Sequence, residues 1–186
     1  MSSHTLLPGR VVAALLLALV TTSASAHPGH GDAGLLAGLS HPFGIDHLLA
    51  IVAVSFWSIT LPGKQKWWGP TAFMAGLTGG ALIGFGAAAF PYLEQAIAVS
   101  VVLIGALLLI PRSRFSTSTG LVLVALAGVV HGLGHGAEAP QGSLPSYAAG
   151  FLLTTGLLHV GAVLIGMRLH GHVAGTGAAI RRLLRH

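Results

Sequence analysis

The sequence contains no cysteine and few charged residues: nine Lys or Arg and four Asp or Glu among 186 residues. The absence of cysteine excludes disulfides and thiolate metal sites. A soluble domain usually has about a quarter of its residues charged, whereas the share here is 7%, and 53% of the residues are hydrophobic. Because so few charges cannot cover a water-facing surface, we predict an all-α, polytopic helix bundle embedded in a lipid bilayer.

Histidine is the abundant metal-binding residue, with 11 copies. With only nitrogen and oxygen ligands, a metal site would favour borderline divalent ions such as Ni²⁺, Co²⁺ or Zn²⁺. The basic residues form no patch with interleaved aromatic side chains, which would be typical of nucleic-acid binding. The expected partners are therefore a divalent metal ion and the lipid bilayer, and not a nucleic acid.

Residues 1–26 have the pattern of a signal peptide. Arg10 precedes a short apolar core over residues 11–20, and small residues at 24–26 supply a cleavage site. The alternative is an uncleaved membrane anchor, although the core is shorter than the roughly 20 residues of a spanning helix. Cleavage would make His27 the N-terminus of a chain exported to a periplasm-like space.

Residues 27–34 then form a short polar tether at the mature N-terminus. It carries His27, His30 and Asp32. The free α-amino group and the His27 imidazole could chelate one metal ion together, with His30 close by. A disordered tether without a metal role is the alternative that the sequence leaves open.

Five apolar segments follow the tether, and each is near the length needed to span a bilayer. They cover residues 35–61, 68–89, 93–110, 119–137 and 146–167. We therefore predict a transmembrane domain of about five helices over residues 35–167.

The basic residues of the mature chain lie only in alternate connections and in the C-terminal tail. Two lie between the first and second segments, two between the third and fourth, and four after the fifth: Lys64, Lys66, Arg112, Arg114, Arg168, Arg181, Arg182 and Arg185. Under the positive-inside rule, the mature N-terminus is on the outer, periplasm-like side and the C-terminus is cytoplasmic in a multi-pass membrane protein. Residues 168–186 are then a basic cytoplasmic tail on the inner leaflet.

Glycines recur at four-residue spacing in two of the predicted spans. The second span carries Gly76, Gly80 and Gly84, and the fourth carries a matching set: Gly128, Gly132 and Gly136. Such ridges let helix backbones approach closely. They predict tight packing either within the chain or between protomers of a homo-oligomer.

The first cluster of candidate ligands is His41, Asp46 and His47 in the first span. A carboxylate beside a histidine costs several kcal/mol in hydrocarbon unless it is paired, protonated or metal-bound. Pro42 suits a first helical turn better than a helix interior. We therefore expect a helix break near His41 that brings it back over Asp46, as in the interrupted helices of transporters. The alternative is a helix-capping His41 and a structural Asp46–His47 hydrogen bond.

The second cluster is His131, His135 and Glu138 at the end of the fourth span. On a helix, these three side chains fall within about 60° of arc. The histidine pair could hold one metal ion, with the carboxylate as third ligand or at the entrance. A histidine face that serves only helix packing is the alternative.

His159 stands alone in the fifth span. It is a candidate ligand, or a core histidine bonded to Thr155 one turn earlier. In the predicted topology, Glu138 and His135 come first from the outside. His131 lies about 10 Å deeper than Glu138, at 1.5 Å per residue. His159 lies slightly past the middle of the fifth span. The polar residues then form a ladder that suits stepwise ligand exchange of a divalent cation.

Three stretches resemble the HupE/UreJ family of small bacterial membrane proteins. They read H-P-F-G-I-D-H-L-L-A-I-V-A-V from His41, H-G-L-G-H-G-A-E from His131 and G-F-L-L-T-T-G-L-L-H-V-G around His159. The chain has one residue fewer between His41 and Asp46 than the family pattern. The resemblance implies secondary uptake of Ni²⁺, or Co²⁺, across the bacterial inner membrane for hydrogenase or urease, through residues matching the first two motifs: His41, Asp46, His47, His131, His135 and Glu138.

We therefore predict a metal-ion permease and not an enzyme, with Ni²⁺ or Co²⁺ as the transported ion. An intramembrane zinc-dependent hydrolase is one alternative, with His131, His135 and Asp46 on Zn²⁺ and Glu138 as base. An H-E-x-x-H helix would favour it, but here the Glu follows the histidine pair. A membrane metal sensor or storage protein without transport is the other alternative.

Overall fold

The computed structural model describes residues 34–85, 91–139 and 142–183, and the side chains of Glu138 and of residues 171–183 are outside this description. These parts contain α-helices and short 3₁₀ helices and no β-strand, which confirms the all-α prediction. The α-helices are α2 (Leu35–Ser40), α3 (Ile45–Ser58), α4 (Trp68–Gly84), α5 (Leu93–Leu107), α6 (Thr117–Glu138) and α7 (Leu144–Leu183). Three 3₁₀ helices connect them: η2 (His41–Phe43), η3 (Gly63–Trp67) and η4 (Arg112–Arg114).

Two of the described helices are long and apolar enough to cross a membrane. They are α6, with 21 residues over Thr117–Ala137, and α7, with 27 residues over Leu144–His170. The bent pair α2–α3 would be a third span if it crosses as one unit. Because α4 and α5 are shorter, with 17 and 15 residues, the number of five spans stays a prediction. The signal peptide lies outside the described residues.

The first predicted span is broken where the sequence indicates. Pro42 stands in the first turn of η2, and the extended Gly44 (φ −55°, ψ 142°) separates η2 from α3. The helices on either side meet at 65°. Proline tolerates the first turn of a helix because its missing N–H would have no helical partner there. The break near His41 is therefore confirmed.

The two glycine ridges face each other across the contact between α4 and α6. A Cβ atom on any glycine of the α4 ridge would overlap the α6 backbone at Ala125, Val129 or Leu133. A Cβ atom on the α6 ridge would likewise overlap the α4 backbone at Phe73, Leu77 or Ala81. The ridges thus serve packing within the chain, and they carry no argument for a homo-oligomer.

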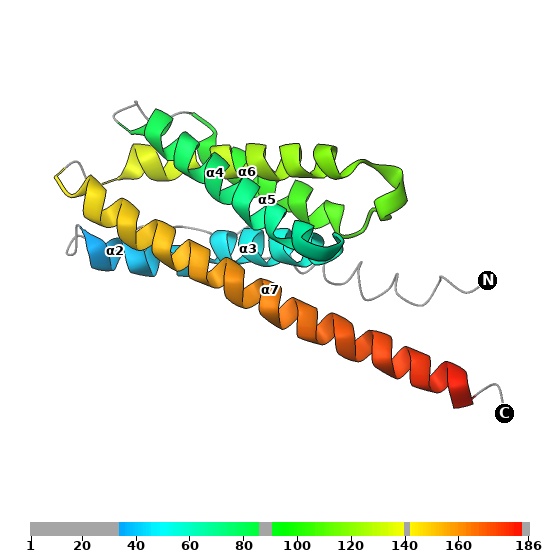
Figure 1. The fold of residues 1–186 in the computed structure, drawn as a ribbon. Helices are drawn as coiled ribbons and strands as arrows, with labels where there is room; N and C mark the ends of the chain where they lie inside the picture. Colours follow the sequence, from blue (N-terminus) through cyan, green and yellow to red (C-terminus); the bar gives the residue numbers. More distant parts are fainter. Residues whose placement is uncertain (1–33, 86–90, 140–141, 184–186) are drawn as a thin grey trace.

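Helix α2 contacts α7 through a second close approach. A Cβ atom on Gly38 would overlap the carbonyl oxygen of Tyr147, and one on Gly150 would lie 2.5 Å from that of Leu35. Helix α3 packs against α4, α5 and α7. The bundle therefore contains two tightly joined helix pairs, α4–α6 and α2–α7, with α3 between them (Figure 1).

Apolar side chains fill the interior and also cover much of the exterior. The core includes Trp57, Phe73, Leu77 and Val101. Large apolar side chains also point outward from several helices, among them Leu82, Ile83, Leu103 and Leu157. A bundle that is apolar inside and out is what a lipid environment requires, because lipid tails solvate such side chains and water does not.

The two ends of the bundle differ in charge. The α3–α4 and α5–α6 connections lie at one end and carry Lys64, Lys66, Arg112 and Arg114, and the α6–α7 turn lies at the other end (Figure 1). We call the first the basic end. Helix α7 passes Phe56 of α3 and Ile59, the residue after α3, at Gly166. Its C-terminal part projects beyond the other helices at the basic end (Figure 1).

Candidate metal centre

Three histidines from separate segments meet at the helix break. His41 lies in η2, His47 in the first turn of α3 and His135 near the end of α6. One ligand nitrogen of each lies within 4.8 Å of the others. The ring centroid of His135 is 4.4 Å from that of His41 and 4.3 Å from that of His47. These residues form what we call the outer cluster.

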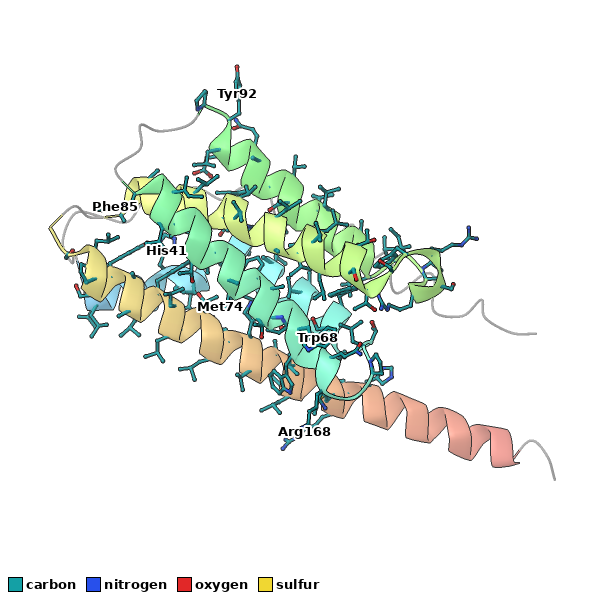
Figure 2. The ribbon with its side chains drawn as sticks, turned by 45° about the horizontal axis from the view of Figure 1, so that its top comes forward. His41, Trp68, Met74, Phe85, Tyr92 and Arg168 are labelled. Atoms are coloured by element: carbon teal, nitrogen blue, oxygen red, sulfur yellow. The ribbon has the colours of Figure 1, made fainter. Side chains whose placement is uncertain are left out.

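The break is what brings His41 into the outer cluster. In a continuous helix, positions 41 and 47 would be 600° apart at about 100° per residue, and so on different faces. With the 65° bend at Gly44, the two ring centroids lie 5.4 Å apart. Figure 2 shows His41 between α7 and the α4–α6 pair. His41 therefore reaches His47 and His135 although one residue fewer separates it from Asp46 than in the family pattern.

Aromatic rings of α7 close one side of the outer cluster. The Phe151 centroid lies 4.9 Å from that of His135, 5.5 Å from that of His47 and 5.7 Å from that of His41. Tyr147, one turn earlier, stacks on Phe151 and lies 5.9 Å from His41. Sequence reasoning missed both residues, because their one-turn spacing on α7 does not reveal which helices they face.

Comparison with known proteins now decides the family. The family model described as "HupE / UreJ protein" matches residues 15–183. "Protein HupE" of Rhizobium leguminosarum bv. viciae is 41% identical over 154 residues, which are 81% of this chain and 80% of that protein. This chain belongs to the HupE/UreJ family. No solved structure matches it.

Membership of the HupE/UreJ family settles two of the predictions. The family is one of membrane transporters, so this chain is a membrane protein and the prediction that it is not an enzyme is confirmed. The family is linked to nickel or cobalt uptake for hydrogenase or urease. The buried histidines of this HupE/UreJ protein are thus candidates for handling a metal ion.

Asp46 stands beside the outer cluster and pairs with one of its histidines. Its Oδ2 atom lies 3.5 Å from Nδ1 of His47. The Nε2 atom of His47 is buried and has no hydrogen-bond partner among the described residues. A carboxylate at one ring nitrogen holds the other nitrogen ready for a metal ion. Asp46 is therefore placed to orient His47.

His131 extends the outer cluster one turn down α6. Its ring centroid lies 5.4 Å from that of His47. Its Nδ1 atom lies 2.9 Å from the carbonyl oxygen of Ala127 and 3.4 Å from Oγ of Ser100. A carbonyl oxygen only accepts, so Nδ1 donates its proton to Ala127 and Nε2 keeps a free lone pair. That Nε2 is buried without a partner in the described part of the chain.

His159 lies apart from the outer cluster, and its partner differs from the predicted one. Its Nδ1 atom lies 3.1 Å from Oγ of Ser55 on α3. Thr155 instead donates to the carbonyl oxygen of Phe151, so the suggested His159–Thr155 bond is wrong. The ring of Phe73 neighbours both His159 and His131, with its centroid 5.4 Å and 5.5 Å from theirs.

Three predicted ligands have no described side chain. Glu138 ends α6, but its side chain lies outside the described part, and His27 and His30 fall outside the described residues altogether. Their metal roles therefore stay predictions.

The donor set suits a borderline metal ion. Buried histidine nitrogens without a described partner come from four residues: Nε2 of His47, His131 and His159, and both ring nitrogens of His135. Buried polar atoms in native proteins are nearly always paired. Imidazole nitrogen is a preferred ligand of Ni²⁺, Co²⁺ and Zn²⁺, and such an ion at the outer cluster would use one ring nitrogen each of His41, His47 and His135.

Proposed function

We propose that this protein is a secondary permease that takes up Ni²⁺, or Co²⁺, across the bacterial inner membrane for hydrogenase or urease maturation. The observation that carries the proposal is the outer cluster. It joins His41, His47 and His135 in an apolar interior, with ligand atoms within 4.8 Å of one another. Ionisable side chains at membrane depth are expensive, and they mark ion pathways when they face one another.

The proposed ligands differ in role. His41, His47 and His135 bind the ion first, and His131 receives it one turn deeper. Asp46 orients His47 and supplies negative charge against the cation. His27, His30 and Glu138 capture ions at the outer surface. Since imidazole and carboxylate ligands suit Ni²⁺ and Co²⁺ alike, the same set serves both ions.

Transport proceeds by short ligand exchanges. The ring centroids of His41, His135, His47 and His131 follow one another at 4.4, 4.3 and 5.4 Å. An ion can therefore gain a new ligand before it releases the previous one, which avoids an uncompensated charge in the bilayer. The break at Gly44 resembles the interrupted helices with which transporters build ion sites near mid-membrane.

The proposed topology has five spans after a cleaved signal peptide, with the outer cluster facing the periplasm. It is supported by the basic end, which carries all four described loop Lys and Arg residues, because basic loops stay in the cytoplasm. Figure 2 shows Trp68 and Arg168 toward this end, away from His41 and Phe85. The tail after residue 167 is then cytoplasmic.

Uptake of ⁶³Ni²⁺ by cells tests the proposal. We expect Asp46→Asn and His131→Ala to reduce uptake by roughly 10- to 100-fold, the range for loss of a ligand or of a group that orients one. His170→Gln, which changes an exposed histidine of α7, should match wild type. Equal uptake in all variants would exclude the proposed pathway.

Ni²⁺ that binds to reconstituted protein but never accumulates in vesicles would instead indicate a sensor or storage protein.

A further inference from the structure

A second polar site lies beside Phe73, further along α3 and α7 than the outer cluster. His159 is 1% exposed and Ser55 is 0% exposed. They come from α7 and α3, and Nδ1 of His159 lies 3.1 Å from Oγ of Ser55. The other ring nitrogen, Nε2, is buried and has no hydrogen-bond partner in the described part of the chain.

The position of this pair follows from the helices that carry it. Ser55 lies two helical turns after His47 on α3, and His159 lies two turns after Phe151 on α7, so each is about 12 Å further along its helix than the outer cluster. Both helices run toward the basic end, where Gly166 of α7 meets Ile59, the residue after α3. The pair therefore lies between the outer cluster and the basic end.

Phe73 connects the two sites in space. Its ring lies tilted at 63° to that of His131 and at 64° to that of His159. Phe73 is 1% exposed, so its ring is packed in the interior beside both imidazoles. The face of an aromatic ring attracts cations, so a phenylalanine at this position does not repel a metal ion.

We propose that His159, oriented by Ser55, is an inner ligand that receives the metal ion from His131 past the ring of Phe73. This inference rests on the proposed function. When Nδ1 donates to Ser55, the lone pair of Nε2 is free for the ion, as at other histidine ligands that donate from their second nitrogen. The path then has two metal-binding sites, and Phe73 packs against His131 at one and His159 at the other.

Two substitutions distinguish a ligand from a core residue. His159→Gln keeps a side chain that can bond Ser55 but removes the imidazole ligand. His159→Cys removes that bond but supplies a sulfur ligand that binds Ni²⁺, and the chain has no other cysteine. A merely structural role predicts that Gln is tolerated better than Cys. A ligand role predicts the reverse.

The test uses the full chain in proteoliposomes that enclose a Ni²⁺-quenched dye, with equal pH on both sides. We expect His159→Gln to slow Ni²⁺ entry by about tenfold or more, and His159→Cys to restore a rate within about threefold of wild type. His170→Gln, on the exposed part of the same helix, is the matched control. Equilibrium binding of Ni²⁺ to the purified His159→Gln protein should stay within about twofold of wild type, because the outer cluster is intact.

Each result has one meaning. Wild-type rates in His159→Gln, or low rates in both variants, would overturn the inner ligand while leaving the permease standing. No Ni²⁺ entry with wild-type protein would overturn the proposed function and the inference with it. If His159→Gln loses Ni²⁺ binding as well, its fold is disturbed, and His159→Cys alone then decides: a restored rate supports the ligand and a lost rate overturns it.

Discussion

Helix α6 presents two different faces to its neighbours. One face carries the glycines that press against the backbone of α4. The other, only about 100° away on a helix, carries His131 and His135, whose Nε2 atoms have no partner among the described residues. The glycine face packs closely against the α4 backbone, whereas the histidine face has ring nitrogens without a described hydrogen-bond partner. Under the proposed function, the glycine face fixes α6 against α4 and the histidine face binds the ion.

The largest effect is expected on the glycine face. A Cβ atom at Gly132 would overlap the carbonyl oxygen of Leu77, which is backbone and cannot move aside. Gly132→Val should therefore force α4 and α6 apart and cost about 3 kcal/mol or more of folding free energy. Thermal unfolding in detergent measures this loss. At Gly79, where a Cβ atom meets nothing within 4 Å, Gly79→Ala should leave the unfolding temperature unchanged or raise it.

The histidine face should give the opposite result. His135→Ala removes two buried ring nitrogens that have no described partner, and this gain offsets part of the packing lost with the ring, so we expect a smaller loss of stability than for Gly132→Val. The outer cluster loses its central ligand, and Ni²⁺ affinity should fall by about 100-fold. Calorimetric titration and thermal unfolding of the same sample separate the two effects. A large drop in stability with unchanged Ni²⁺ affinity would show that the histidine face is ordinary packing.

A smaller effect is expected at the helix break. Gly44 has φ −55°, which alanine adopts readily. Its Cβ atom would, however, lie 2.9 Å from Oδ1 of Asp46 and turn that carboxylate away from His47. Gly44→Ala should therefore fold normally and weaken Ni²⁺ binding by about threefold. Complete loss of an orienting group would weaken binding by about 10- to 100-fold. A titration against wild type would detect it, and unchanged affinity would mean that Asp46 does not orient His47.

The smallest effect is expected at Ser100. Its hydroxyl lies 3.4 Å from Nδ1 of His131, while the Ala127 carbonyl oxygen accepts from the same atom at 2.9 Å. Ser100→Ala leaves the shorter bond in place. Ni²⁺ affinity should stay within about twofold of wild type, since the net value of a long hydrogen bond is below about 1 kcal/mol. A tenfold loss would show that Ser100, rather than Ala127, sets the orientation of His131.

The sequence predicts those features that depend on neighbouring residues. Pro42 indicates the helix break, and the glycine spacing indicates close helix packing, because both effects act on the backbone locally. The apolar segments indicate the helices. The pairing of His159 with Ser55 was not predictable, since the two residues are 104 positions apart. The positions of Phe73 and Phe151 beside the histidines were not predictable either, because an aromatic residue in an apolar helix fits the core of any bundle.

The glycine contacts also determine which parts can move. Because α4 is joined to α6 and α2 to α7 at backbone distance, we expect each pair to move as one rigid body. His131 and His135 belong to the first body, whereas His159 and the wall formed by Phe151 belong to the second. In the proposed permease, a hinge or shear displacement between these bodies would change the number of histidines that reach the bound ion, so that movement of the helices and release of the ion would occur together.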